Sequence, residues 1–101
     1  MQTVETHALQ WAGRSLEVRY CADWSTVYRE VYGYALAHLE IDAKGEPLPV
    51  TATGYLSRFD RADNIEAAGG AVALVLGWLD EAAKFPEWQE QQAKRQQLSL
   101  F

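Results

Sequence analysis

Along the first sixty residues, apolar and polar side chains often alternate one by one, which is the period of a β-strand with one buried face. The segment "THALQWAGRSLEVRYC" holds two such stretches around Ala12-Gly13-Arg14, and this predicts two strands joined by a tight turn. The alternation assigns the side chains of the second stretch to two faces: Leu16, Val18 and Tyr20 to one, Glu17 and Arg19 to the other.

Two further strands are predicted by β-branched and aromatic content. They are "YALAHLEID" (34–42) and "VTATGYLSRF" (50–59), and the loop between them is rich in Gly and Pro, so we expect them to pair as a hairpin. Gly54, within the fourth strand, indicates a bulge or a close approach of another backbone. Between the second and third strands, "STVYREVYG" predicts a turn of helix that Ser25 caps and Gly33 ends.

After residue 60 the spacing changes to that of helices. "DRADNIEAAGG" predicts a short helical turn capped by Asp60 or Asp63, and "AVALVLGWLDEAAKF" (71–85) predicts the helix that packs across the sheet. Pro86 ends this helix and fits the first turn of the next one. The apolar stripe predicted to face the sheet consists of Val72, Val75, Leu76, Leu79 and Ala83.

The last predicted helix, "PEWQEQQAKRQQ", is polar on nearly all sides. Such a helix usually projects into solvent, so we interpret it as a stalk docked by Phe85 and Trp88. Together the elements predict an α+β fold: an antiparallel sheet of about four strands, one packed helix, a polar helix and a tail. The expected division is a globular domain over residues 1–85 and a helix with a docking tail over 86–101.

Charge and cysteine content narrow the function classes. The 101 residues carry a net charge of −5, and the basic residues are not clustered, which argues against direct nucleic-acid binding. The single cysteine, Cys21, excludes an internal disulfide and favours a reducing compartment. The N-terminus lacks the pattern of a signal peptide, and "AVALVLGWL" is too short to cross a bilayer. We therefore expect a cytoplasmic protein without membrane contact.

The chain ends in "QLSLF", which consists of Gln97, Leu98, Ser99, Leu100 and Phe101. All five positions match the pentapeptide consensus by which bacterial proteins dock on the replication sliding clamp, and the segment resembles that motif. The resemblance implies that Leu100 and Phe101 fill an apolar pocket of the clamp, that Leu98 contacts a neighbouring patch, and that the Gln97 amide hydrogen-bonds through both of its polar atoms. The alternative is that these apolar residues cover the protein's own core.

A second candidate site lies in the predicted sheet. His38 and Glu40 are two residues apart and share a strand face, and Tyr55 and Arg58 follow in the next strand. These four residues are a candidate ligand or acid–base site, although a solvated sheet face with satisfied hydrogen bonds is the simpler interpretation. No metal or cofactor motif is present in the sequence.

The segments "YALAHLEID", "LPVTATGYLSRF" and "GGAVALVLGWLDEAA" resemble small proteins of plasmids and integrated mobile elements. This resemblance and the clamp-binding-like tail together lead us to expect a non-enzymatic adaptor or modulator. It would dock on the sliding clamp and bind a second protein partner through its globular part. Two alternatives stay open: an anti-defence inhibitor that acts through the globular surface, and a small enzyme or ligand binder that uses His38, Glu40, Tyr55 and Arg58.

Overall fold

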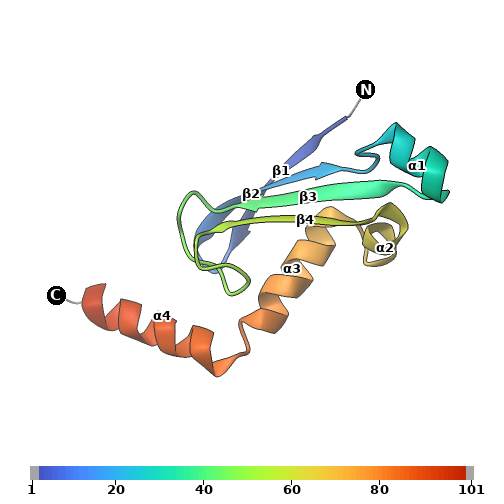
Figure 1. Cartoon of the computed structure of the whole chain (residues 1–101). Helices are drawn as coiled ribbons and strands as arrows, with labels where there is room; N and C mark the ends of the chain where they lie inside the picture. Colours follow the sequence, from blue (N-terminus) through green and yellow to red (C-terminus); the bar gives the residue numbers. More distant parts are fainter. Residues whose placement is uncertain (1–2, 100–101) are drawn as a thin grey trace.

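Four antiparallel strands form one sheet in the order β1-β2-β3-β4, and one helix crosses one face of it (Figure 1). The computed structural model describes residues 3–99. The predicted α+β class is confirmed. The elements, in chain order, are β1 (Glu5–Trp11), β2 (Arg14–Cys21), α1 (Thr26–Tyr32), β3 (Leu36–Asp42), β4 (Tyr55–Arg61), α2 (Ala62–Ala67), α3 (Ala71–Ala82) and α4 (Pro86–Ser99).

The β1–β2 connection is the tight turn that the sequence predicts. Trp11 pairs with Arg14, and the two residues between them, Ala12 and Gly13, have φ values of 47° and 78°. Positive φ at both central positions gives a turn whose twist matches that of the flanking strands. Because strand partners that lie directly opposite share a face, this register also places Leu9 beside Leu16.

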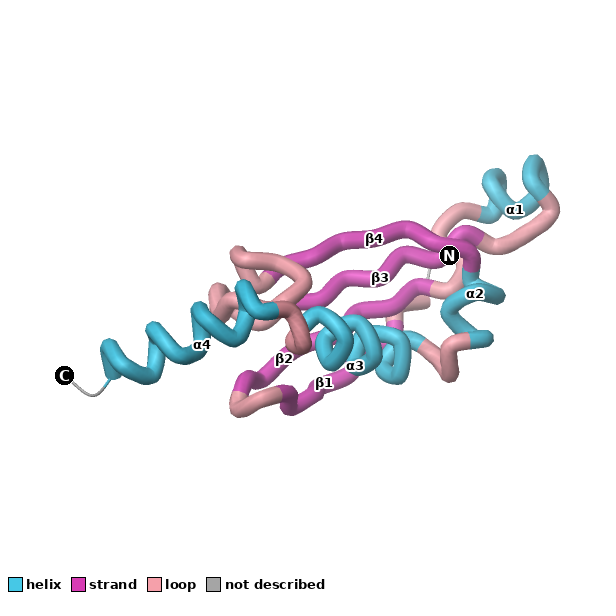
Figure 2. The backbone as a smooth tube through the Cα atoms, turned by 90° about the horizontal axis from the view of Figure 1, so that it is seen from below, coloured by secondary structure: helices cyan, strands magenta, loops and turns pink. Residues whose placement is uncertain are grey.

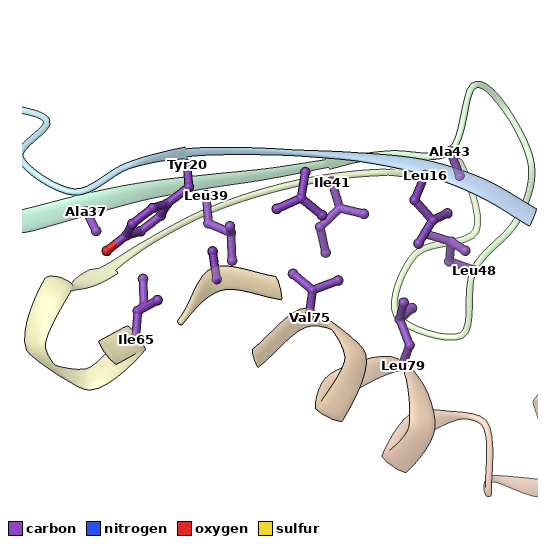
Figure 3. Close-up of a cluster of buried hydrophobic side chains, with 12 residues drawn as sticks. Leu16, Tyr20, Ala37, Leu39, Ile41, Ala43, Leu48, Ile65, Val75 and Leu79 are labelled. Atoms are coloured by element: carbon purple, nitrogen blue, oxygen red, sulfur yellow. The ribbon is translucent and has the colours of Figure 1, made fainter. Parts of the chain in front are cut away.

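The core lies between the sheet and α3 (Figures 2 and 3). Strand alternation directs one set of side chains toward α3, as predicted for β2, and the helix contributes side chains at spacings of four. Val75 and Leu79 of the predicted helix stripe are fully buried, while Val72, Leu76 and Ala83 are only partly buried. The buried cluster comprises Leu16, Val18, Tyr20, Ala37, Leu39, Ile41, Ala43, Leu48, Ile65, Ala71, Val75 and Leu79.

α1 is capped as predicted. The Ser25 hydroxyl accepts a hydrogen bond from the Tyr28 amide at 3.1 Å, and Gly33 ends the helix in the left-handed conformation. The predicted cap of α2 is wrong: Arg61 occupies the cap position without a side-chain cap bond, and Asp63 lies in the first turn. The Asp60 carboxylate instead accepts from the Arg61 backbone amide, at 2.7 Å.

The fourth strand begins later than expected, at Tyr55 rather than at residue 50. Gly54 precedes it with φ of 81°, and a Cβ there would lie 2.5 Å from the backbone oxygen of Glu46. The predicted close approach is therefore present, and it ends the preceding loop at the point where the strand starts.

Within residues 3–99, no helix combines the length and apolar character needed to span a membrane.

Candidate functional site

The first turn of α4 is fixed to the body through Trp88, which is 8% exposed. Its ring centroid lies 6.1 Å from that of Trp11, and the Arg14 guanidinium carbon lies 5.0 Å from the ring centroid. Trp11 is held in turn by a 2.9 Å hydrogen bond to the Asp80 carboxylate of α3. The predicted docking role of Trp88 fits this geometry, but Phe85 is 60% exposed and does not share it. Of the two aromatic residues, only Trp88 packs against the body of the protein.

Further along α4, two polar contacts continue the attachment. Arg14 donates to the Gln92 side-chain oxygen at 2.6 Å, and Arg95 donates to the Glu46 carboxylate. The helix is therefore tied to the β1–β2 turn and to the β3–β4 loop over three turns. Sequence reasoning missed these contacts because it assigned α4 beyond Trp88 to solvent. Residues 78 positions apart, such as Arg14 and Gln92, leave no local pattern that reveals the pairing.

The C-terminal end of α4 projects beyond the sheet (Figure 1). The helical backbone continues through Gln97, Leu98 and Ser99, two residues further than the predicted end, and the Gln97 side chain is exposed. The predicted contacts of Leu100 and Phe101 fall outside the described residues. Because clamp-binding peptides of this type are expected to be extended, docking would require the last turn of α4 to unwind.

His38, Glu40 and Tyr55 do converge, on the sheet face opposite α3. His38 Nε2 lies 2.7 Å from the Ser57 hydroxyl, and the Tyr55 hydroxyl donates to Glu40 at 2.6 Å. His38 Nδ1 lies 3.8 Å from the other Glu40 oxygen. The strand register explains the grouping, because Glu40 lies directly opposite Ser57 and next to Tyr55 on the same face. The predicted set of four residues did not include Ser57, although its parity with Tyr55 indicates the shared face.

Arg58 does not belong to this cluster. It lies opposite Leu39, a core residue, and so projects from the α3 face, where its guanidinium carbon is 4.8 Å from the Trp78 ring centroid. Strand parity explains the difference: residues 55 and 57 share one face, and residue 58 has the other. The grouping of Arg58 with His38, Glu40 and Tyr55 is therefore wrong as a description of one site.

Electrostatic interactions in the cluster favour the ionised form of Glu40. The hydrogen bond from Tyr55, together with Arg19, holds the pKa of Glu40 below its ordinary value, and the same bond raises the pKa of Tyr55. The order Ser57, His38, Glu40 is that of a nucleophile, a base and an orienting carboxylate. Three hollows among residues 3–99 are lined by other residues, however, and none of the three includes a residue of this cluster. We interpret the cluster as a polar surface of the sheet.

A second set of residues consists of exposed apolar and aromatic side chains on α1 and at the end of the sheet next to it, and we call this set the aromatic end. The Trp24 and Phe59 rings meet edge to face with centroids 5.0 Å apart, and Phe59 also packs on His38 at 4.5 Å. On α1, Val27 and Val31 are 68% and 67% exposed. Large exposed apolar side chains close together are typical of protein-binding surfaces. The members of the aromatic end are Trp24, Val27, Val31, Tyr32 and Phe59.

Comparison with known proteins assigns the fold to a family. A family model described as the KlcB third domain matches residues 4–88. This span covers most of the chain, so the protein belongs to the KlcB third-domain family. The match points to a plasmid-associated bacterial protein and ends at Trp88, before most of α4. No curated protein and no solved structure matches the chain.

Proposed function

We propose that this protein is a non-enzymatic adaptor that docks on the bacterial replication sliding clamp through Gln97, Leu98, Ser99, Leu100 and Phe101. The observation that carries the proposal is the attachment of α4. Trp88, Gln92 and Arg95 hold its first three turns, and the pentapeptide begins only after them. The molecule measures 56 Å along its longest axis and 22 and 19 Å along the others, so the helix end lies well clear of the sheet (Figure 2).

The energetics of docking are compatible with a moderate affinity. Burial of a Leu and a Phe side chain stabilises a complex by about 1.5–3 kcal/mol each. Ordering a terminal segment costs about 2–5 kcal/mol. Unwinding Gln97 to Ser99 adds little, because the last turn of a helix is held by few hydrogen bonds and frays readily. The two side chains therefore leave at most about 4 kcal/mol, so Leu98, Gln97 and backbone hydrogen bonds to the host would have to contribute about as much again to reach an affinity of about 1 μM.

The test is direct binding of the full chain to a purified bacterial sliding clamp, measured by surface plasmon resonance. We expect saturable binding that the double substitution Leu100→Ala and Phe101→Ala abolishes. The matched control replaces Gln89 and Gln91 by Ala, two exposed residues of the same helix outside the pentapeptide. Equal affinity of the wild type and the Leu100/Phe101 variant would refute clamp docking, and so would equal losses in both variants.

The aromatic end favours a second function, binding of another protein by the globular part. Its exposed side chains are of the kind that dominates protein interfaces. Membership in the KlcB third-domain family supports a plasmid-associated setting, in which the bound protein would be a component of host defence. This proposal predicts a complex that survives removal of Gln97–Phe101.

We expect the substitution pair Val27→Glu and Val31→Glu to abolish this complex, since both side chains are exposed and contribute nothing to the core. The pair Gln89→Glu and Gln91→Glu, which adds the same charge on α4, is the control. Affinity capture from bacterial lysate, followed by mass spectrometry, identifies the partner, and titration of the purified partner then measures the effect. A partner that binds the Val27/Val31 variant as tightly as the wild type would exclude the aromatic end as its site.

A further inference from the structure

A hollow of about 410 Å³ lies where α4 meets the body. The β1–β2 hairpin contributes Arg14 and Ser15 to its wall, the β3–β4 loop contributes Glu46, and α4 contributes Gln92 and Arg95. Its walls therefore come from three segments that are far apart in the sequence. Its volume falls within the range of pockets that bind small molecules.

The charged groups around this hollow are unbalanced. Arg95 is paired with the Glu46 carboxylate. Within residues 3–99, Arg14 makes no ion pair, and its hydrogen bonds go to two neutral oxygens, those of Gln92 at 2.6 Å and of the Ala12 backbone at 3.1 Å. Two guanidinium groups therefore face one carboxylate. The resulting local excess of positive charge stands out in a chain whose net charge is −5.

Arg14 is also incompletely satisfied. Its Nε–H is buried and has no hydrogen-bond partner among the described residues. Burial, and then the charge of Arg95, lower the pKa of Arg14 from its ordinary value, while the Glu46 carboxylate acts in the opposite direction. A negatively charged group in the hollow would relieve the repulsion between the two guanidinium groups.

We propose that this hollow binds a phosphate-type oxyanion between Arg14 and Arg95. Guanidinium groups bind phosphate oxygens through paired N–H donors, and Glu46 occupies only the Nη2 side of Arg95. Gln92 accepts from Arg14 through its oxygen, so its amino group can donate to the anion. A bound anion would link the hairpin to α4.

The source of the phosphate is either inorganic phosphate or the phosphate ester of a nucleotide, for which the hollow also has room. The site is independent of clamp docking, because none of its lining residues belongs to the pentapeptide. Its test contains no clamp, so a failure of one proposal leaves the other intact.

The test is isothermal titration calorimetry of the full chain with sodium phosphate and, separately, with adenosine monophosphate, at constant ionic strength set with chloride. We expect saturable binding of at least one probe, and Arg95→Gln should weaken it by about tenfold or more. The matched control is Lys94→Gln, which removes the same charge from the neighbouring, exposed position. Tighter binding of the nucleotide would identify the ester as the source, and equal affinities would identify the phosphate group alone.

A second variant guards against loss of structure. Because Arg14 also stacks on Trp88, its replacement could detach α4, whereas Glu46→Gln leaves these contacts in place. Glu46→Gln removes the competing carboxylate and should tighten phosphate binding several-fold. Absence of saturable binding up to about 10 mM of either probe would overturn the proposal. Equal weakening in Lys94→Gln and Arg95→Gln, or no change in Glu46→Gln, would overturn it as well.

Discussion

Replacement of Trp88 by Ala should cost far more stability than replacement of Phe85 by Ala. The two aromatic residues lie three positions apart, yet Trp88 is 8% exposed and Phe85 is 60% exposed. Truncation of a buried Trp costs about 3–5 kcal/mol, since apolar burial is lost and a cavity remains. Trp88 also contacts the Trp11 ring and the Arg14 guanidinium, and both contacts disappear with it.

We expect about 3 kcal/mol for Trp88→Ala, the lower end of that range, because Trp88 packs at the edge of the body, where neighbours can partly close the gap. For a domain of this size, such a loss corresponds to a decrease in melting temperature of about 12–24 °C. Phe85→Ala should change the free energy of unfolding by less than about 0.5 kcal/mol, as expected for an exposed side chain.

The assay is urea denaturation followed by far-UV circular dichroism, combined with amide hydrogen exchange of α4. If Trp88 is the anchor, exchange in α4 should accelerate more than exchange in β2 and β3, since detachment of the helix is a local opening. Equal destabilisation by the two substitutions would refute the assignment of Trp88 as the anchor. Unchanged exchange in α4 of the Trp88 variant would refute it independently.

Three further substitutions test other parts of the structure. Gly54→Ala should destabilise the fold by about 3 kcal/mol, because φ is 81° and the added Cβ would lie 2.5 Å from the Glu46 backbone oxygen. Gly77→Ala in α3, where an added Cβ would have nothing within 4 Å, should stabilise it by about 0.5–1 kcal/mol. Thermal denaturation of the two variants measures both effects. Tyr55→Phe should raise the pKa of Glu40 toward its ordinary value of about 4.3, measured by carboxyl NMR titration. Because the pKa of Glu40 is lower in the folded than in the unfolded state, Glu40 stabilises the fold at pH values above its unfolded-state pKa, and this stabilisation is lost as the pH falls through the folded-state pKa. The Tyr55 variant should therefore lose less stability on acidification than the wild type. An unchanged Glu40 titration would contradict the hydrogen bond.

The elements with strong local periodicity were predictable from the sequence. Strict alternation over Leu16 to Tyr20 identified both the strand and its buried face. The Ser25 cap and the Gly33 end followed from the chemistry of helix termini. The start of β4 was missed because Val50 to Thr53 have strand-like composition, while the approach of Glu46 to Gly54 fixes the loop there.

The candidate sites depended on information that is not local. Strand parity alone separates Arg58 from Tyr55, so that part was available in the sequence and was overlooked. The contacts of Arg14 with Trp88 and Gln92 join segments with no shared pattern, and only the fold brings them together. For the same reason, the hollow between the hairpin and α4 could not be predicted from motifs.

The arrangement of the two proposed protein-binding surfaces bears on how an adaptor would work. The aromatic end and α1 lie at one end of the elongated molecule, and the terminus of α4 lies at the other (Figures 1 and 2). The sheet separates the surfaces along an axis of 56 Å, so a partner at one of them need not cover the other. Distant sites without shared contacts contribute independently to binding. The Val27/Val31 and Leu100/Phe101 substitutions should therefore have additive effects on a ternary complex, and a strong deviation from additivity would show that the two surfaces serve one partner.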